Sequence, residues 1–203
     1  LISIIVGLGL ADLARSLRDL VRPDRAVRWH WLPLVWAGIV FLIVLQLWWT
    51  SFRLLQSEVF GQVLVFLPYL LSFLVLYLAC AFALPDSDWE ANGPSGDGGA
   101  EADEGRLDLE AFYFSLAHRR WFFGSMIVLL VLGQVMGTAL AVTWDRVEVN
   151  LWARVQTVGF NLVIAALFGG LIAIRRWWVH VGATLFVLAA VLYSLATGIP
   201  PLG

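Results

Sequence analysis

Long runs of apolar residues constrain this sequence more than any other feature. A helix needs roughly twenty apolar residues to cross a hydrocarbon layer about 30 Å thick, and lipid offers no other partner to backbone polar groups. Six stretches meet this need, at about residues 1–20, 31–52, 63–84, 121–142, 151–174 and 177–198. The first is the shortest, because its purely apolar part ends at Leu10. The sequence therefore predicts an all-α membrane protein with six transmembrane helices.

The composition excludes several other classes of protein. Hydrophobic residues make up 61% of the chain and charged residues 14%, whereas soluble domains carry about 25% charged residues. All thirteen basic residues are arginine and the net charge is -2, with no basic cluster suited to a nucleic-acid backbone. Cys80 is the single cysteine, which excludes disulfides within the chain and cysteine zinc clusters. We expect no nucleic-acid partner, no metal and no cofactor.

The arginines predict how the chain is threaded through the membrane, since flanking positive charge is retained in the cytoplasm. When the arginines are counted in alternate loops, ten fall on one side of the membrane and three on the other. The richer side holds Arg15, Arg18, Arg22, Arg25, Arg28, Arg106, Arg119, Arg120, Arg175 and Arg176, and the other holds Arg53, Arg146 and Arg154. This bias favours six spans, with both termini outside and the long middle loop in the cytoplasm.

The middle loop divides the chain into two halves. Residues 86–105 carry seven acids and no base among many glycines, a composition that cannot bury a core. We interpret this segment as a disordered acidic cytoplasmic tether between a three-helix half at 1–85 and a second at 106–203. An interfacial helix is expected over 107–120, before the fourth span. Because three is odd, the second half would run inverted relative to the first, as in many transporters.

Three histidines lie at the predicted cytoplasmic entrances of the even-numbered spans. Arginine and tryptophan at this level follow from the charge rule and the aromatic belt, but histidine does not. The imidazoles could be plain interfacial side chains, could hold an anionic lipid headgroup together with the arginines, or could share a metal. Asp12, which lies with Asp19 in the first predicted span, is expected to pair with Arg15. The candidates for an entrance or headgroup site are Asp12, Arg15, Arg28, His30, His118, Arg119, Arg120, Arg175, Arg176 and His180.

Uncharged polar residues deep in the predicted bilayer form a second group. Glutamine and threonine one helical turn apart occur in both the second and the fourth span, and an asparagine reaches a comparable depth in the fifth. Such groups are expected to converge on one another or on water. They either hydrogen-bond between helices or line a polar path. The candidates are Gln46, Thr50, Gln134, Thr138 and Asn161.

Small residues indicate where helices can approach closely. Gly133 and Gly137 form a GxxxG pattern, and Ala165, Gly169 and Ala173 repeat the spacing in the next span. Packing within one chain and packing between copies are both compatible with these faces. We expect a homo-oligomer.

One pair of residues in the sequence is compatible with an enzyme. Ser125 and His180 are expected at similar depth, as are the catalytic serine and histidine of rhomboid proteases, but Gly124-Ser125-Met126 lacks the glycine that follows the serine in the rhomboid motif. The protein is therefore expected not to be an enzyme.

Four aromatic-rich motifs support a resemblance. They are GLGL at 7–10, RWHWLPLVW at 28–36, LQLWW at 45–49 and RRWFFG at 119–124. With them the chain resembles a group of small bacterial multi-span membrane proteins of no assigned function. The resemblance implies a bacterial inner membrane and supplies no reaction or ligand.

The sequence supports two functional hypotheses. The first is a conduit, channel or transporter, for a small solute or ion, lined by the deep polar residues and biased toward anions by the cytoplasmic arginines. The second is a non-conducting scaffold or accessory subunit that holds a membrane-protein partner.

Overall fold

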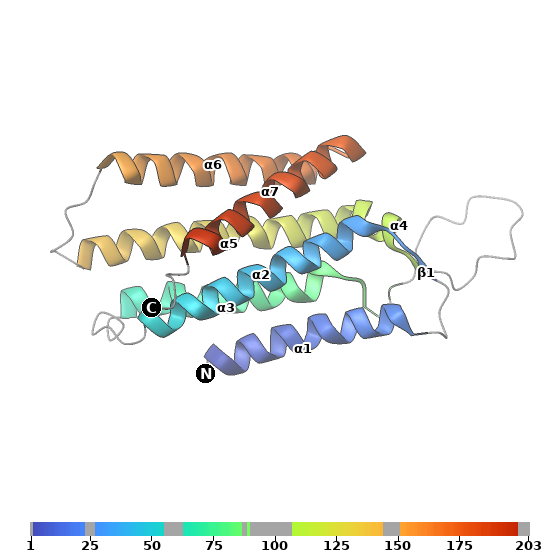
Figure 1. The fold of residues 1–203 in the computed structure, drawn as a ribbon, viewed down its shortest axis with the longest axis horizontal. Coiled ribbons are helices and arrows are strands. Elements are labelled where there is room, and N and C mark those ends of the chain that lie inside the picture. The colour runs from blue at the N-terminus through green and yellow to red at the C-terminus, as the bar shows by residue number, and fades with distance from the viewer. Residues whose placement is uncertain are drawn as a thin grey trace, which may run out of the picture.

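Seven helices and one short strand pair make up the described part of the chain (Figure 1). The computed structural model describes residues 2–22, 27–54, 63–86, 89, 107–143 and 151–198. Its elements are α1 (Ile2–Val21), β1 (Val27–Arg28), α2 (Trp31–Leu54), α3 (Val63–Ala83), β2 (Leu107–Asp108), α4 (Leu109–Phe114), α5 (Leu116–Thr143), α6 (Leu151–Ala173) and α7 (Trp177–Gly198). The helical class is confirmed. Apart from Asp86 and Trp89, the predicted tether lies outside the described residues.

Five of the helices are long and apolar enough to cross a membrane. The candidate spans are Trp31–Ser51, Phe66–Ala83, Leu116–Ala139, Val155–Ala173 and Trp177–Thr197. They match the second to sixth predicted stretches. Helix α1 is not among them, because its second half carries Asp12, Arg15, Arg18 and Asp19.

Helix α1 is instead amphipathic. It lies beside α2 and α3, with its charged end toward the end of the bundle that also holds β1 and α4 (Figure 1). Its buried residues are Gly9, Leu13, Ser16 and Leu20, which recur every three or four positions. A Cβ on Gly9 would lie 3.4 Å from Cys80 Sγ, so this glycine allows α1 and α3 to pack closely. The GLGL motif thus has a packing role at its second glycine.

The outer surface of the bundle is apolar along its length and aromatic at its ends. Large side chains such as Val131, Leu162 and Leu185 are exposed on different helices. Trp121 and Trp178 are 66% and 77% exposed at the arginine-rich end. Exposed tryptophans at the ends of apolar helices are typical of the two membrane–water interfaces. These features are those of an integral membrane protein.

The two halves of the sequence pack against each other. Helix α3 of the first half makes its most extensive contact with α5 of the second, and α2 contacts α7. Trp36 of α2 is fully buried and meets Phe122, Phe123 and Phe168 edge to face, at ring-centroid distances of 5.6, 5.1 and 5.9 Å. This aromatic cluster joins α2, α5 and α6 toward the arginine-rich end.

The segment 107–120 differs from the single interfacial helix that we expected. A bend at Ser115 separates α4 from α5, so the fourth span begins at Leu116. Phe112 and Tyr113 of α4 are buried in the bundle and do not lie on lipid. Asp108 caps α4 by accepting hydrogen bonds from the backbone N–H groups of the residues two and three positions on.

A parallel two-residue pairing of β1 with β2 was not predicted. It places Arg28 beside Asp108, with 3.1 Å between the guanidinium Nη1 and the carboxylate Oδ2. The segment that precedes α2 is thereby tied to the segment that precedes α4.

Candidate functional site

The end of the bundle that holds most of the arginines contains a buried chain of hydrogen bonds. The indole Nε1 of Trp36 donates to the hydroxyl of Tyr113 at 3.1 Å, and this hydroxyl lies 3.0 Å from Nδ1 of His180. All three side chains are fully buried. They come from α2, α4 and α7, so the chain of bonds fixes three elements to one another.

The hydrogen positions in this series of hydrogen bonds are determined by His180. His180 Nε2 lies 2.8 Å from the carbonyl oxygen of Ile174, which can only accept, so Nε2 carries the hydrogen. In the neutral ring Nδ1 is then the acceptor, and the Tyr113 hydroxyl donates to it. Burial raises the pKa of the Tyr113 phenol, an effect that the hydrogen bond from Trp36 partly offsets. The phenol therefore keeps the proton that this arrangement requires.

Arg119 is a buried cation that caps a neighbouring helix. Its Nη1 donates to the carbonyl oxygens of Ile172 at 3.0 Å and Ile174 at 3.4 Å, at the C-terminal end of α6. The last carbonyls of a helix have no partner in their own helix and carry partial negative charge. The side chain is 5% exposed and has no carboxylate partner in the described part of the chain. Arg119 and His180 together hold the turn between α6 and α7.

The His118 ring is buried and has no hydrogen bond to another described residue. It is 5% exposed and stacks on Phe122, with ring centroids 5.2 Å apart and planes at 10°. Neither ring nitrogen has a hydrogen-bond partner among the described residues. The backbone carbonyl of Phe82 lies near the ring, but not in the geometry of a hydrogen bond. A buried polar group in this state calls for a specific explanation.

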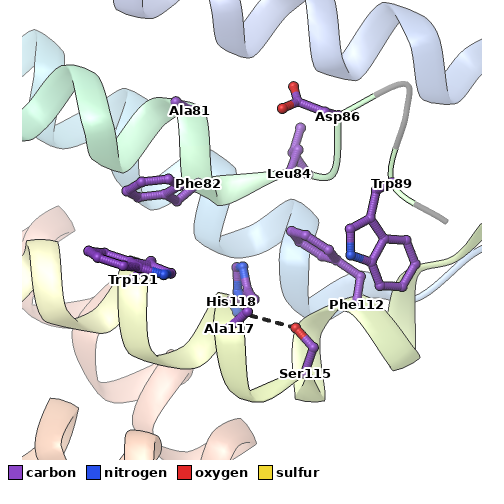
Figure 2. A pocket seen from close by; sticks show the side chains of 10 residues that line it. All are labelled: Ala81, Phe82, Leu84, Asp86, Trp89, Phe112, Ser115, Ala117, His118 and Trp121. Carbon is purple, nitrogen blue, oxygen red and sulfur yellow. Dashed lines mark hydrogen bonds between the residues drawn. The ribbon is translucent and has the colours of Figure 1, made fainter. Parts of the chain in front are cut away.

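A cavity of about 360 Å³ lies above His118, between the end of α3 and the beginning of α5. Figure 2 shows the imidazole pointing from α5 toward α3, between Trp121 on one side and Phe112 on the other. Most of the lining is apolar, and one of the described lining residues carries a formal charge. The lining residues are Ala81, Phe82, Leu84, Asp86, Trp89, Phe112, Ser115, Ala117, His118 and Trp121.

The three histidines do not meet at one point. His118 and His180 approach Tyr113 from different helices, with ring centroids 5.6 and 5.3 Å from the phenol ring. His30 stacks on its neighbour Trp31. Within the described ranges, no group of three or more His, Cys, Asp or Glu residues is placed to hold a metal ion. Each histidine therefore has an environment of its own.

The other entrance candidates are spread over the same end of the bundle. Arg120, Arg175 and Arg176 are exposed, whereas Asp12 is half-buried on α1. The described residues contain no ion pair between Asp12 and Arg15, so that expectation was wrong. The pair on α1 joins two adjacent residues, Arg18 and Asp19, at 3.2 Å.

Of the deep polar residues of α2, Gln46 contacts α7, whereas Thr50 is exposed and bonded within its own helix. The side-chain amide of Gln46 donates to the hydroxyl of Ser194, and the Thr50 hydroxyl donates to the backbone carbonyl of Gln46 at 2.9 Å. The first bond joins two helices directly. Ser194 was not among the predicted polar residues.

The deep polar residues of α5 and α6 show a different pattern. The Thr138 hydroxyl donates to the backbone carbonyl of Gln134 at 2.9 Å, and Asn161 is half-buried on α6. Gln134 Nε2 is buried and has no hydrogen-bond partner in the part of the chain that the structure describes. No hydrogen bond between described residues joins this group to Gln46 or Thr50. A single path lined by all five residues stays a prediction.

The small residues of α5 are not used for packing within the described chain. A Cβ on Gly133 or Gly137 would meet no described residue within 4 Å outside its own stretch of helix, and the same holds for Gly169 on α6. Both α5 glycines are exposed, whereas Ala165 is half-buried and Ala173 exposed on α6. Packing between chains stays a prediction for these faces.

Ser125 and His180 do not form a catalytic pair in the described chain. The Ser125 hydroxyl donates to the carbonyl of Phe122 at 2.7 Å. Both ring nitrogens of His180 are engaged with Tyr113 and Ile174. Neither nitrogen is therefore available to take a proton from the serine.

Trp36 and Tyr113, the two partners that give His180 its role, were not predicted as site residues. Trp36 stands within an apolar run, and Tyr113 within a segment that we expected to lie on lipid. Both carry one polar atom on a large apolar ring, and such residues usually find a partner when buried. That rule was the signal that could have singled them out.

Comparison of the chain with protein-family models, with curated proteins and with solved structures finds no match in any of the three. Function is therefore inferred from the chemistry of the described residues.

Proposed function

We propose that this chain is a non-enzymatic scaffold or accessory subunit of a larger membrane complex. The observation that carries the proposal is the exposed face of α5 around Gly133 and Gly137, against which no side chain of the described residues packs. Small residues let two helix backbones approach closely in a membrane. The occupant of this face is then a transmembrane helix of another membrane protein.

Two further features support a scaffold. The hydrogen bonds of Trp36, Tyr113 and His180 and the cap provided by Arg119 tie α2, α4, α5, α6 and α7 together at one end. The Gln46 amide is bonded directly to Ser194, which ties α2 to α7. A fixed bundle end and a closed interhelical contact suit a protein that holds a partner.

The test is the composition of the complex after extraction in mild detergent, measured as its mass and subunit ratio. We expect a foreign subunit in a fixed ratio, lost when Gly133 and Gly137 are both replaced by leucine. The matched control is Gly182→Leu on α7, since Gly182 is also exposed and has no described residue within 4 Å of the position of an added Cβ. A single chain alone, or a ring made of this chain only, contradicts the scaffold; the ring would support the homo-oligomer that we expected.

The conduit remains the second candidate, and one observation favours it. The Gln134 amide nitrogen is buried at depth in α5 without a partner among the described residues, and such a group needs water or a solute. We expect flux through vesicles that contain the purified chain, reduced when Gln134 is replaced by leucine. No flux in the wild type, or an unchanged flux in a variant with leucine at both Gln46 and Gln134, removes this candidate.

The six-span arrangement belongs to the same proposal. The five apolar helices, together with α1 as a sixth span, would place both termini outside and residues 86–105 in the cytoplasm of a bacterial cell. Clustering of Arg28, Arg119, Arg120, Arg175 and Arg176 at one end of the bundle supports this orientation. Reporter fusions within 86–105 and at both termini test it, and a middle loop on the outside contradicts it.

A further inference from the structure

The cavity above His118 combines two observations that neither proposed function uses. It has a volume of about 360 Å³, at the small end of the range of about 300–1,000 Å³ that is usual for ligand sites. At its base lies an imidazole that is 5% exposed, with both ring nitrogens unpaired among the described residues. Groups of this kind inside a protein are normally hydrogen-bonded, so an unpaired imidazole beside a cavity indicates a missing partner.

The walls of the cavity determine what kind of partner fits. Four aromatic rings surround it, from Phe82, Trp89, Phe112 and Trp121 (Figure 2). The one formal charge among the described lining residues is the carboxylate of Asp86, which is exposed at the end of α3. Aromatic faces attract cations, and a carboxylate adds to that attraction.

We propose that this cavity binds a small organic ligand through an ammonium group. The charge lies among the aromatic rings, with Asp86 at the edge of the cavity. One N–H of the ammonium is donated to a nitrogen of His118 after a small rotation of the imidazole. The same rotation lets the other nitrogen, as N–H, donate to the carbonyl of Phe82, the backbone group that lies near the ring. Both orphaned nitrogens then have partners.

An anion fits the cavity less well, although arginines are numerous at this end. The Arg119 guanidinium is directed to the carbonyls at the end of α6 and does not line the cavity. No arginine is among the described lining residues, so an anion would meet the Asp86 carboxylate without a compensating cation from them. An anionic headgroup held by the arginines would therefore bind outside this cavity.

The ammonium group can come from a lipid headgroup or from a free amine. The cavity lies at the level of Trp121, which is 66% exposed at the end of a candidate span, and such tryptophans mark the depth of lipid headgroups. Phosphatidylethanolamine carries a primary ammonium with N–H donors. Phosphatidylcholine carries a cation without N–H donors, and phosphatidylglycerol carries an anion alone. Comparison of the three lipids therefore separates the contribution of the N–H donors from that of the positive charge.

The experiment uses the purified full chain in nanodiscs made of equal parts of these three lipids. Retained lipid is identified by native mass spectrometry, and protonated ethanolamine is titrated calorimetrically against the chain in nanodiscs that lack phosphatidylethanolamine. We expect about tenfold preference for the primary ammonium over the quaternary one, lost in His118→Phe. Asp86→Asn should instead weaken the retention of both ammonium lipids relative to phosphatidylglycerol. Asp19→Asn and His30→Phe, a matched acid and a matched histidine that do not line the cavity, keep the preference.

Retention of phosphatidylethanolamine without binding of ethanolamine assigns the ligand to lipid, and the reverse result assigns it to a free amine. Binding of neither, a preference for phosphatidylglycerol, or retention of the ammonium lipids over phosphatidylglycerol that Asp86→Asn leaves unchanged overturns the proposal. Because Asp86 is exposed, its variant stays informative even where His118→Phe fails to fold. The outcome does not depend on whether the chain is a scaffold or a conduit.

Discussion

Replacing Tyr113 with phenylalanine removes one oxygen atom from the centre of the buried hydrogen-bond chain. Phenylalanine keeps the ring, so the packing against Trp36 and His180 is preserved. The bonds of 3.1 Å to the Trp36 indole and 3.0 Å to the His180 imidazole are both lost. The indole N–H and the imidazole Nδ1 are then buried without partners.

The magnitude depends on what surrounds these groups. A buried polar group left without a partner costs about 1–3 kcal/mol in soluble proteins, whereas hydrogen bonds between transmembrane helices average about 0.6 kcal/mol. Trp36, Tyr113 and His180 are fully buried within the protein itself, so the first range is the better guide. Since two such groups are left unpaired, we expect Tyr113→Phe to lower the free energy of unfolding by about 2–6 kcal/mol.

The assay is reversible unfolding in mixed micelles of rising dodecyl sulfate content, followed by near-ultraviolet circular dichroism. Tyr193→Phe is the control, because Tyr193 is 72% exposed on α7 and should have no effect. Trp36→Phe should cost less in the Tyr113→Phe background than in the wild type, since the indole N–H is already unpaired there. A loss equal to that of the control, or two fully additive losses, would refute the hydrogen-bond chain.

Three further predictions test other parts of the bundle. Replacing Arg119 with methionine should speed hydrogen exchange in the last turn of α6, because the cap on its carbonyls is lost; unchanged exchange there contradicts the cap. Gly9→Leu should force α1 from α3 and make the buried Cys80 thiol reactive to a membrane-permeant maleimide, whereas Gly7→Leu should not; equal labelling of both variants contradicts the contact. Because the pKa of Tyr113 is raised, the folded chain keeps the phenol proton that the unfolded chain releases, so stability should be unaffected below pH of about 10 and fall above it. Denaturation at rising pH measures this fall, which Tyr113→Phe should reduce.

The helices were predictable from the sequence because length and hydropathy alone decide them. A run of twenty apolar residues has one solution in lipid, and the second to sixth stretches all became helices of the expected type. Which helices pack against each other was less predictable. Mean hydropathy is similar in all five spans, so it gives no reason why α3 should pack on α5 more than on α2.

The local departures have local causes. At the bend, Ser115 is extended, its N–H donates to the Phe112 carbonyl, and its hydroxyl accepts a hydrogen bond from the His118 N–H. Neither this arrangement nor the burial of Phe112 and Tyr113 is revealed by a periodicity within 107–120. The histidines were correctly placed at one end, but the partner of each depends on how the helices meet. His180 is hydrogen-bonded to Tyr113, whereas His118, whose ring also lies beside Tyr113, has nitrogens without a partner among the described residues.

Arg119 and Arg120 illustrate the limit of counting charges. Both arginines belong to the ten that are predicted on the cytoplasmic side, and they count equally toward the predicted orientation. The positive-inside rule treats them as equivalent. Yet Arg120 is exposed, while Arg119 is buried against the end of α6 with no carboxylate beside it in the described chain. Its charge is balanced by the partial negative charge of helix carbonyls, which is the arrangement that a helix C-terminus favours. Neutralising Arg120 should therefore affect orientation only, whereas neutralising Arg119 should affect both orientation and stability, and equal stability of the two variants would contradict this distinction.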